Sequence, residues 1–181
     1  FSLSLAYGRK ANDKVGCGYA LLGVGGISRI LGKLRHSQSY YLKAGRLFAK
    51  SQDVFAQAYS FCGIANALRQ KGDLTLSKKF YLKSYRLYCS LEDWVDLAYV
   101  LWGLGEVYLR LAQLKKALPY LQKSERLFKK YNETRGEVLA GLSIAHCLHA
   151  QGKTDRASRM FKQAYELARR AHIYPYLEIF T

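Results

Sequence analysis

The feature that most constrains this chain is an internal repeat with a period of forty residues. When the sequence is shifted by forty residues, its small, aromatic and apolar positions align without a gap. One aligned column holds Gly25, Ala65, Gly105 and Ala145, and another holds Tyr41, Tyr81, Leu121 and Phe161. Such a pattern predicts an array of similar units, each packed mainly on its neighbours.

Each unit carries the pattern of two helices. In the third unit, apolar residues recur at helical spacing over 95–111 and again over 114–131. A glycine separates the two segments in the other units, at Gly32, Gly72 and Gly152, where a helix is expected to end in a left-handed residue. An acidic residue marks the start of each unit, at Asp13, Asp53, Asp93 and Glu133. Aspartate at this place suits a turn or a helix N-cap.

The columns of small residues indicate where the paired helices touch. Two helices approach closely only where one side chain is Gly, Ala or Ser, and a large side chain of the facing helix then fills the space opposite. We therefore expect the column of Gly25 and Ala65 to face the column of Tyr41 and Tyr81.

These residues lead to a known family. The segment YSFCGIANALRQKGDLTLSKKFYLKSYRLY, residues 59–88, resembles the tetratricopeptide repeat. Ile64-Ala65 stands at its Leu-Gly step, Leu68 at its tyrosine and Gly72-Asp73 at its Gly-Asp turn. Ser77, Tyr81 and Ser84 hold its Ala, Phe and Ala places. The period exceeds the standard of about 34 residues and is similar to the longer repeats of kinesin light chains and bacterial peptide-sensing regulators.

The resemblance implies an all-α fold, a right-handed α-solenoid of antiparallel helix pairs, as one array over residues 1–181. Four full repeats cover 14–53, 54–93, 94–133 and 134–173. Residues 1–13 match the second helix of a preceding repeat, and 174–181 match the start of a further repeat or a capping helix. We interpret the chain, which opens at Phe1, as a piece of a longer protein.

The resemblance also implies a peptide-binding groove on the concave face formed by the first helices. The family's groove positions fall on Tyr19, Leu22, Gly26, Arg29, Tyr59, Cys62, Asn66, Arg69, Tyr99, Trp102, Glu106, Leu109, Leu139, Leu142, His146 and His149. In this groove Trp102 would serve as a large anchor, Arg29 and Arg69 would pair with carboxylates, and Asn66 would bind a peptide backbone.

Two features of the implied groove stay open. The tyrosines at 19, 59 and 99 either bind a partner or pack on the neighbouring repeat. Leu22 and Cys62 occupy places where the chaperone-tail clamp of the family has a lysine, which argues against a chaperone C-terminal tail as the partner.

Positive charge dominates the composition. The chain has 29 Lys and Arg against 13 Asp and Glu, a formal net charge of +16. This charge favours an acidic partner, either a protein or peptide of acidic character, nucleic acid or an anionic membrane face, or serves solubility alone. A basic stripe follows the second helices, which should form the convex face. It consists of Lys43, Arg46, Lys83, Arg86, Lys123 and Arg126. This stripe is either a solvated face or a binding surface for nucleic acid or an acidic partner.

Sharper chemical motifs fail on spacing. The stretch GCGYALLGVGGISRILGK, residues 16–33, has five residues between Gly26 and Gly32 where a phosphate loop needs four, and Leu34 follows Lys33 instead of Ser or Thr. His146 and His149 share a helix face, but Cys147 points elsewhere, so no metal site is predicted. Cys62 has no recognisable catalytic companions. The sequence therefore predicts no enzyme and no cofactor.

The remaining expectations concern the setting of the protein. No apolar stretch is long enough to span a bilayer, so membrane insertion is not expected. Four cysteines without CxxC spacing favour a reduced, cytoplasmic protein. Together these features predict a non-catalytic scaffold that binds a protein or peptide, with nucleic-acid or acidic-partner binding on the basic stripe as the alternative. The oligomeric state stays open.

Overall fold

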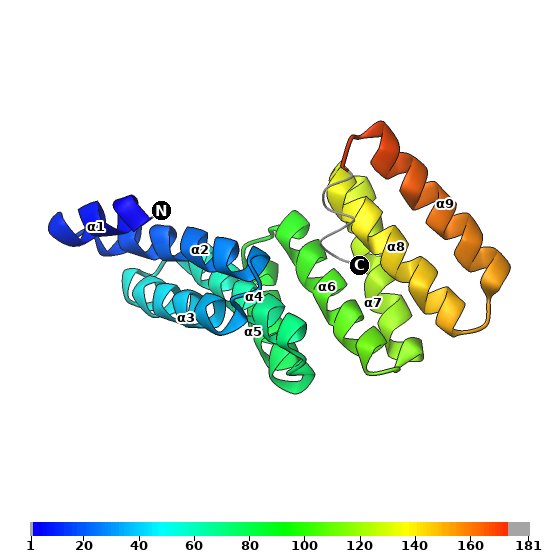
Figure 1. Cartoon of the computed structure of the whole chain (residues 1–181), viewed down its shortest axis with the longest axis horizontal. Helices are drawn as coiled ribbons and strands as arrows, with labels where there is room; N and C mark the ends of the chain where they lie inside the picture. The colour runs from blue at the N-terminus through cyan, green and yellow to red at the C-terminus, as the bar shows by residue number, and fades with distance from the viewer. Residues whose placement is uncertain (1, 174–181) are drawn as a thin grey trace. The chain divides into compact units, whose positions relative to one another are not determined.

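The computed structural model describes residues 2–173, apart from the side chains of Ser2 and Arg9. Nine elements form this region, and all are helices: α1 (Ser2–Lys10), α2 (Lys14–Ile30), α3 (Leu34–Ser51), α4 (Val54–Lys71), α5 (Leu74–Ser90), α6 (Trp94–Arg110), α7 (Leu114–Lys130), α8 (Thr134–Ala150) and α9 (Thr154–Arg170). Helices that form a pair run antiparallel (Figure 1). The predicted all-α solenoid of antiparallel helix pairs is confirmed. The expectation for 174–181 falls outside the described residues.

The chain divides into two compact units at a repeat boundary. Unit 1 comprises residues 1–92 and unit 2 comprises residues 93–181. In unit 1 the first helices of the repeats are α2 and α4, and their second helices are α3 and α5. In unit 2 the first helices are α6 and α8, and the second helices are α7 and α9. No helix within residues 2–173 is both long and apolar enough to cross a bilayer.

The regular helix lengths follow from turns of fixed spacing. A residue with positive φ stands at positions 12, 32, 52, 72, 92, 112, 132, 152 and 172, one every twenty residues. At the turn after α4, the Gly72 N–H bonds to the Arg69 carbonyl and the Asp73 N–H bonds to the Leu68 carbonyl. This pair of bonds satisfies carbonyls that the helix end would otherwise leave without donors. The predicted left-handed glycines at the turns are confirmed.

Aspartates begin several of the helices. The side chains of Asp13, Asp53 and Asp93 accept hydrogen bonds from the backbone N–H groups of Gly16, Ala56 and Asp96, at 2.8, 2.9 and 3.0 Å. Glu133 makes no such bond at the start of α8. The predicted N-cap role of the three aspartates is therefore confirmed.

Close helix approach fixes the core of each unit. The Tyr41 ring of α3 lies between α2 and α4, against Gly25 and Gly63, and a Cβ atom added at Gly63 would overlap the ring. In unit 2, a Cβ atom at Gly105 would come within 2.5 Å of the Leu121 side chain. Ser77 and Ser84 of α5 donate to the carbonyls of Ala65 and Ala58 on α4, at 2.8 and 2.9 Å, so small polar residues also hold a pair together.

The last described repeat departs from the predicted pattern. Phe161 stands in the column of Tyr41, Tyr81 and Leu121, whose side chains are 4%, 0% and 0% exposed, yet it is itself 54% exposed. The expectation that Phe161 fills a space between helices is wrong within the described region. The physical reason is that Tyr41 is covered by the next first helix, whereas no described helix follows α9.

The turns provide a direct test of backbone conformation. Ala112 has a φ of 55° where the other repeats have glycine, and a left-handed alanine is strained by about 1–2 kcal/mol. Glycine loses about 0.4–1 kcal/mol more backbone entropy on folding, so Ala112→Gly should stabilise the protein by about 0.5–1 kcal/mol.

Gly72→Ala is the reverse experiment and should destabilise the protein by a similar amount. A Cβ atom at Gly72 meets nothing within 4 Å, so the effect comes from the backbone alone. Urea unfolding of both variants measures the changes. Shifts of the same sign in the two variants would contradict this description of the turns.

Candidate functional site

The predicted groove residues lie on the first helices of both units. In unit 1, α2 and α4 contact each other and carry Tyr19, Arg29, Tyr59, Cys62 and Asn66. In unit 2, α6 and α8 are neighbours in the same way. Spacings of three, four and seven residues place such side chains on one side of a helix. The geometry of each unit decides which of them reach the surface.

Tyr19 and Tyr99 connect successive repeats. The Tyr19 hydroxyl donates to Oδ2 of Asp53 at 2.8 Å, and the Tyr99 hydroxyl donates to Oε1 of Glu133 at 2.7 Å. The hydrogen bond to Asp53, with a contribution from burial, raises the pKa of Tyr19. Burial, then the bond to Glu133, raises the pKa of Tyr99. Both tyrosines therefore hold the start of the next repeat, whether or not they also bind a partner.

The two rings have different exposure. Tyr19 is 45% exposed and packs edge-on against Phe48, with ring centroids 5.0 Å apart. Tyr99 packs in the same way on Phe128, with ring centroids 4.7 Å apart, but it is less exposed than Tyr19 and is half-buried. Tyr59, at the same register in α4, is 43% exposed. The surface of α2 and α4 thus presents two accessible aromatic rings.

Arg69 does not lie on an open surface, as the sequence interpretation assumed. Its side chain is 2% exposed, and its Nε–H donates to the Tyr81 hydroxyl oxygen at 3.1 Å. Tyr81 in turn donates to Oδ1 of Asn66 at 2.6 Å. This placement has a physical cause, because the bond to Asn66 orients the hydroxyl so that its lone pair faces the guanidinium. Arg69 therefore belongs to a buried polar network.

Arg29, at the same register in α2, has a different environment. Position 26 is glycine where the second repeat has Asn66, so no amide orients the Tyr41 hydroxyl. Burial, followed by the proximity of Tyr59, raises the pKa of Tyr41 to about 12, whereas the charge of Arg29 and its hydrogen bond to the hydroxyl act in the opposite direction. Within the described residues, the buried Nε of Arg29 has no hydrogen-bond acceptor. Arg29, Tyr59 and Cys62 thus surround the Tyr41 hydroxyl, with Gly26 leaving space beside it.

Trp102 is a core residue and not an accessible anchor. It is 6% exposed, and its Nε1–H donates to Oγ of Ser143 at 2.9 Å. The bond from Trp102 to Ser143 joins α6 to α8, and Ser143 in turn donates to the Leu139 carbonyl within α8 at 3.0 Å. The column that contains Trp102 lies where adjacent first helices meet, and a large ring there is covered by its neighbour.

The other predicted groove positions vary in exposure. Leu22, Leu109 and Leu139 are buried. Glu106 and Leu142 are half-buried, and His146 and His149 are exposed. The described residues contain no group of three His, Cys, Asp or Glu side chains placed to hold a metal ion. Cys147 is buried, which raises the pKa of its thiol.

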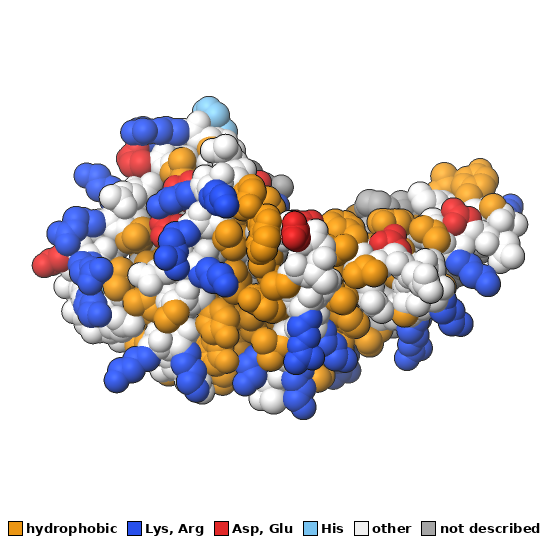
Figure 2. All heavy atoms as spheres, turned by 180° about the vertical axis from the view of Figure 1, so that it is seen from behind, with side chains coloured by type: hydrophobic (Ala, Val, Ile, Leu, Met, Phe, Trp, Pro, Cys, Tyr) orange, Lys and Arg blue, Asp and Glu red, His pale blue; other side chains and the backbone are white. Residues whose placement is uncertain are grey.

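The basic stripe lies on exposed faces of the second helices, as the sequence indicates. All six of its residues are exposed: Lys43, Arg46, Lys83, Arg86, Lys123 and Arg126. The Nζ of Lys83 lies 5.5 Å from the ring centroid of Phe61 and 5.2 Å from that of Phe80, which fixes one of these charges over apolar surface. Figure 2 shows Lys and Arg side chains outnumbering acidic ones over the face that it draws.

Sequence analysis missed the acceptors of the Tyr19 and Tyr99 bonds. Each acidic residue follows its tyrosine by 34 positions, so the same offset in two repeats was the available signal. Asp53 was predicted only as an N-cap, and its second oxygen is the one that Tyr19 contacts.

Removing Arg69 should cost stability. Arg69→Ala leaves the Tyr81 hydroxyl with one partner fewer and opens space in a buried network, for a loss of about 1.5–3 kcal/mol. Arg29→Ala is the matched control, because Arg29 interacts with the Tyr41 hydroxyl but its Nε has no acceptor among the described residues, and it should cost less, about 0.5–1.5 kcal/mol. Thermal unfolding measures both. Equal losses would show that the two arginines are equivalent.

Comparison with known proteins now adds to this geometry. The sequence profile of the tetratricopeptide repeat matches residues 54–130, and a second profile of the same repeat matches 142–170. No curated protein sequence matches the chain.

Solved structures give the same fold. Aspartyl phosphate phosphatase F from Bacillus subtilis superimposes with a TM-score of 0.82 at 15% identity, over 92% of this chain and 44% of that one. A Rap protein complexed with competence and sporulation factor gives 0.81 at 18% identity, over 87% and 44%. A putative kinesin light chain from Podosopora anserina gives 0.68 at 12% identity, over 93% and 83%. The chain thus spans less than half the length of the first two structures.

Proposed function

Because the chain belongs to the tetratricopeptide repeat family, whose arrays are protein-binding scaffolds, we propose that it binds an acidic peptide on the first helices of unit 1. The proposed surface consists of Tyr19, Gly26, Arg29, Tyr59 and Cys62.

We further propose that residues 1–181 act as one array without catalytic activity. The four cysteines have no CxxC spacing, which supports a reducing compartment, and the cytoplasm is the location we propose.

The unsatisfied donor of Arg29 is the observation that carries this proposal. A buried N–H group without an acceptor is costly, and a carboxylate supplies the strongest acceptor for a guanidinium. Glycine at position 26 leaves space beside the Tyr41 hydroxyl, since a Cβ atom there would meet only that hydroxyl, at 3.5 Å. A partner's carboxylate would therefore complete a network that Asn66 and Tyr81 complete inside the second repeat.

The exposed rings supply the second part of the surface. Tyr19 and Tyr59 present amphipathic side chains that lose little entropy on binding, a property common at interfaces. The complex between a Rap protein and competence and sporulation factor shows that an array of similar fold binds a partner, which supports a similar role here.

Binding should depend on Arg29 and not on the basic stripe. Peptides selected on the wild-type protein from a random phage-displayed library should carry a carboxylate. Arg29→Ala should weaken their binding about tenfold or more, because a hydrogen bond to a charged group contributes about 1.5–3 kcal/mol. Fluorescence anisotropy measures the affinity at several salt concentrations.

The control reverses charge on the stripe. Lys83→Glu combined with Arg86→Glu should keep peptide affinity within about twofold, since these exposed residues lie on a second helix. A loss of affinity here, with Arg29→Ala unchanged, would instead support the alternative surface. In that case a single-stranded oligonucleotide should bind with a steep dependence on salt.

A further inference from the structure

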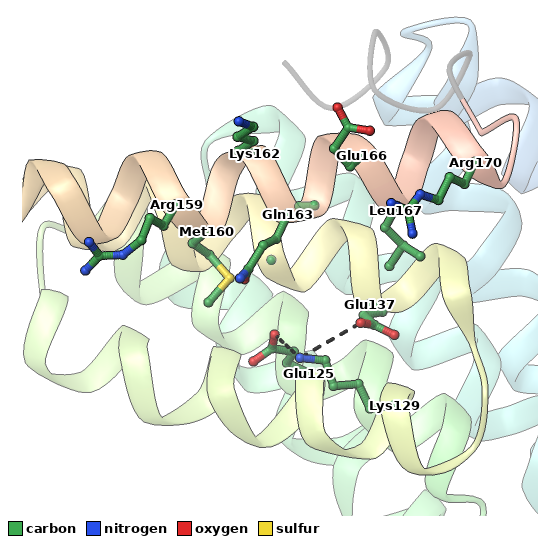
Figure 3. Close-up of a pocket in the computed structure, with 12 residues that line it drawn as sticks. Glu125, Lys129, Glu137, Arg159, Met160, Lys162, Gln163, Glu166, Leu167 and Arg170 are labelled. Atoms are coloured by element: carbon green, nitrogen blue, oxygen red, sulfur yellow. Dashed lines mark hydrogen bonds and ion pairs between the residues drawn. The ribbon is translucent and has the colours of Figure 1, made fainter.

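Unit 2 contains a cleft between its last three helices. Residues of α7, α8 and α9 line this open cleft. Its volume of about 610 Å³ is within the size range of ligand sites in proteins. Figure 3 shows Met160, Gln163 and Leu167 pointing from α9 into this space, whereas Lys162 and Glu166 point away. Gly141 of α8 forms part of its lining.

The repeat register explains why the space is empty of side chains. The corresponding place in unit 1, among α3, α4 and α5, holds Phe61 and Phe80 with ring centroids 6.0 Å apart. Lys83 covers both rings. A shift of eighty residues puts Gly141 at the place of Phe61, Met160 at that of Phe80, and Gln163 at that of Lys83. The fourth repeat therefore lacks both aromatic rings and the cation above them.

The two walls of the cleft differ in charge. Arg159 and Arg170 line it from α9 and are exposed, and neither has a carboxylate within ion-pair distance in the described part of the chain. The opposite wall holds Glu125 and Glu137, and Lys129 lies between them at 2.8 and 3.9 Å. Lys129 offsets one of the two negative charges, and the carboxylates remain able to accept hydrogen bonds from peptide N–H groups.

We propose that this cleft binds a partner's peptide segment in which an aromatic residue is flanked on both sides by acidic residues. The ring packs against the Met160 thioether, which stands at the register of Phe80 in unit 1, and this is a favourable contact for an aromatic edge. The flanking carboxylates pair with Arg159 and Arg170. Eleven residues separate these arginines, about 16 Å along a helix, which an extended peptide spans with about five residues.

Met160 makes the site directly observable. It is the one methionine in the sequence, so ¹³C-methyl labelling places a single intrinsic NMR probe in the cleft, assigned with Met160→Leu. The probe ligand is the peptide Glu-Ser-Phe-Ser-Glu, and Glu-Ser-Ala-Ser-Glu and Gln-Ser-Phe-Ser-Gln are its controls. The phenylalanine peptide should shift the methyl signal upfield through the ring current and saturate. Each control peptide should bind at least tenfold more weakly.

Charge-reversal variants locate the site on α9. The double variant Arg159→Glu with Arg170→Glu should lower the affinity for the phenylalanine peptide at least tenfold. Lys79→Glu with Arg86→Glu makes the same change in net charge on α5 and should leave its affinity within twofold. The proposal is overturned if the phenylalanine and alanine peptides bind alike, if both double variants lose binding equally, or if 1 mM peptide leaves the methyl signal unmoved. Displacement of the peptide by a 20-nucleotide single strand, with a larger methyl shift, would also overturn it in favour of nucleic acid.

Discussion

The insertion of a large side chain from one helix against small residues of its neighbours is the contact on which this fold depends. Tyr41 shows it most fully, because its ring touches Gly25 in its own repeat and Gly63 in the next. The contact needs small and large positions at fixed offsets, so the sequence repeats every forty residues. Left-handed turns every twenty residues keep the helices equal in length, and the contact therefore recurs in register.

The same regularity explains how function can vary between repeats. The backbone positions are nearly equivalent, so one substitution changes a local network without changing the fold. Asn66 accepts a hydrogen bond from Tyr81, and Tyr81 accepts one from the buried Arg69. Gly26 stands at the register of Asn66, and the Nε of Arg29 has no acceptor among the described residues. Gly141 and Met160 replace an aromatic pair in the same way and leave a cleft. Both proposed binding sites are thus places where one repeat lacks a side chain that another has.

The fold was predictable because it is encoded many times over. The small columns, the turn glycines and the N-cap aspartates each recur, and the structure confirms them. The environment of single groove residues was less predictable. Trp102 and Arg69 share a helix face with Tyr99 and Tyr59 in the sequence pattern, but both are buried. Helical spacing gives direction around the axis, whereas burial depends on the reach of the side chain and on what the adjacent helix offers, such as Ser143 or Tyr81.

A double-mutant cycle between Gly63 and Tyr41 tests the packing contact most directly. An eighty-residue shift places Ser143 of the fourth repeat at the register of Gly63 and Leu121 of the third repeat at the register of Tyr41. Serine is therefore compatible with leucine at this pair of positions. Gly63→Ser alone should be strongly destabilising in urea unfolding, because a Cβ atom would overlap the tyrosine ring. In a Tyr41→Leu background the same change should cost much less, giving a coupling free energy of about 1–3 kcal/mol. Additive effects, with a coupling below about 0.5 kcal/mol, would contradict the account.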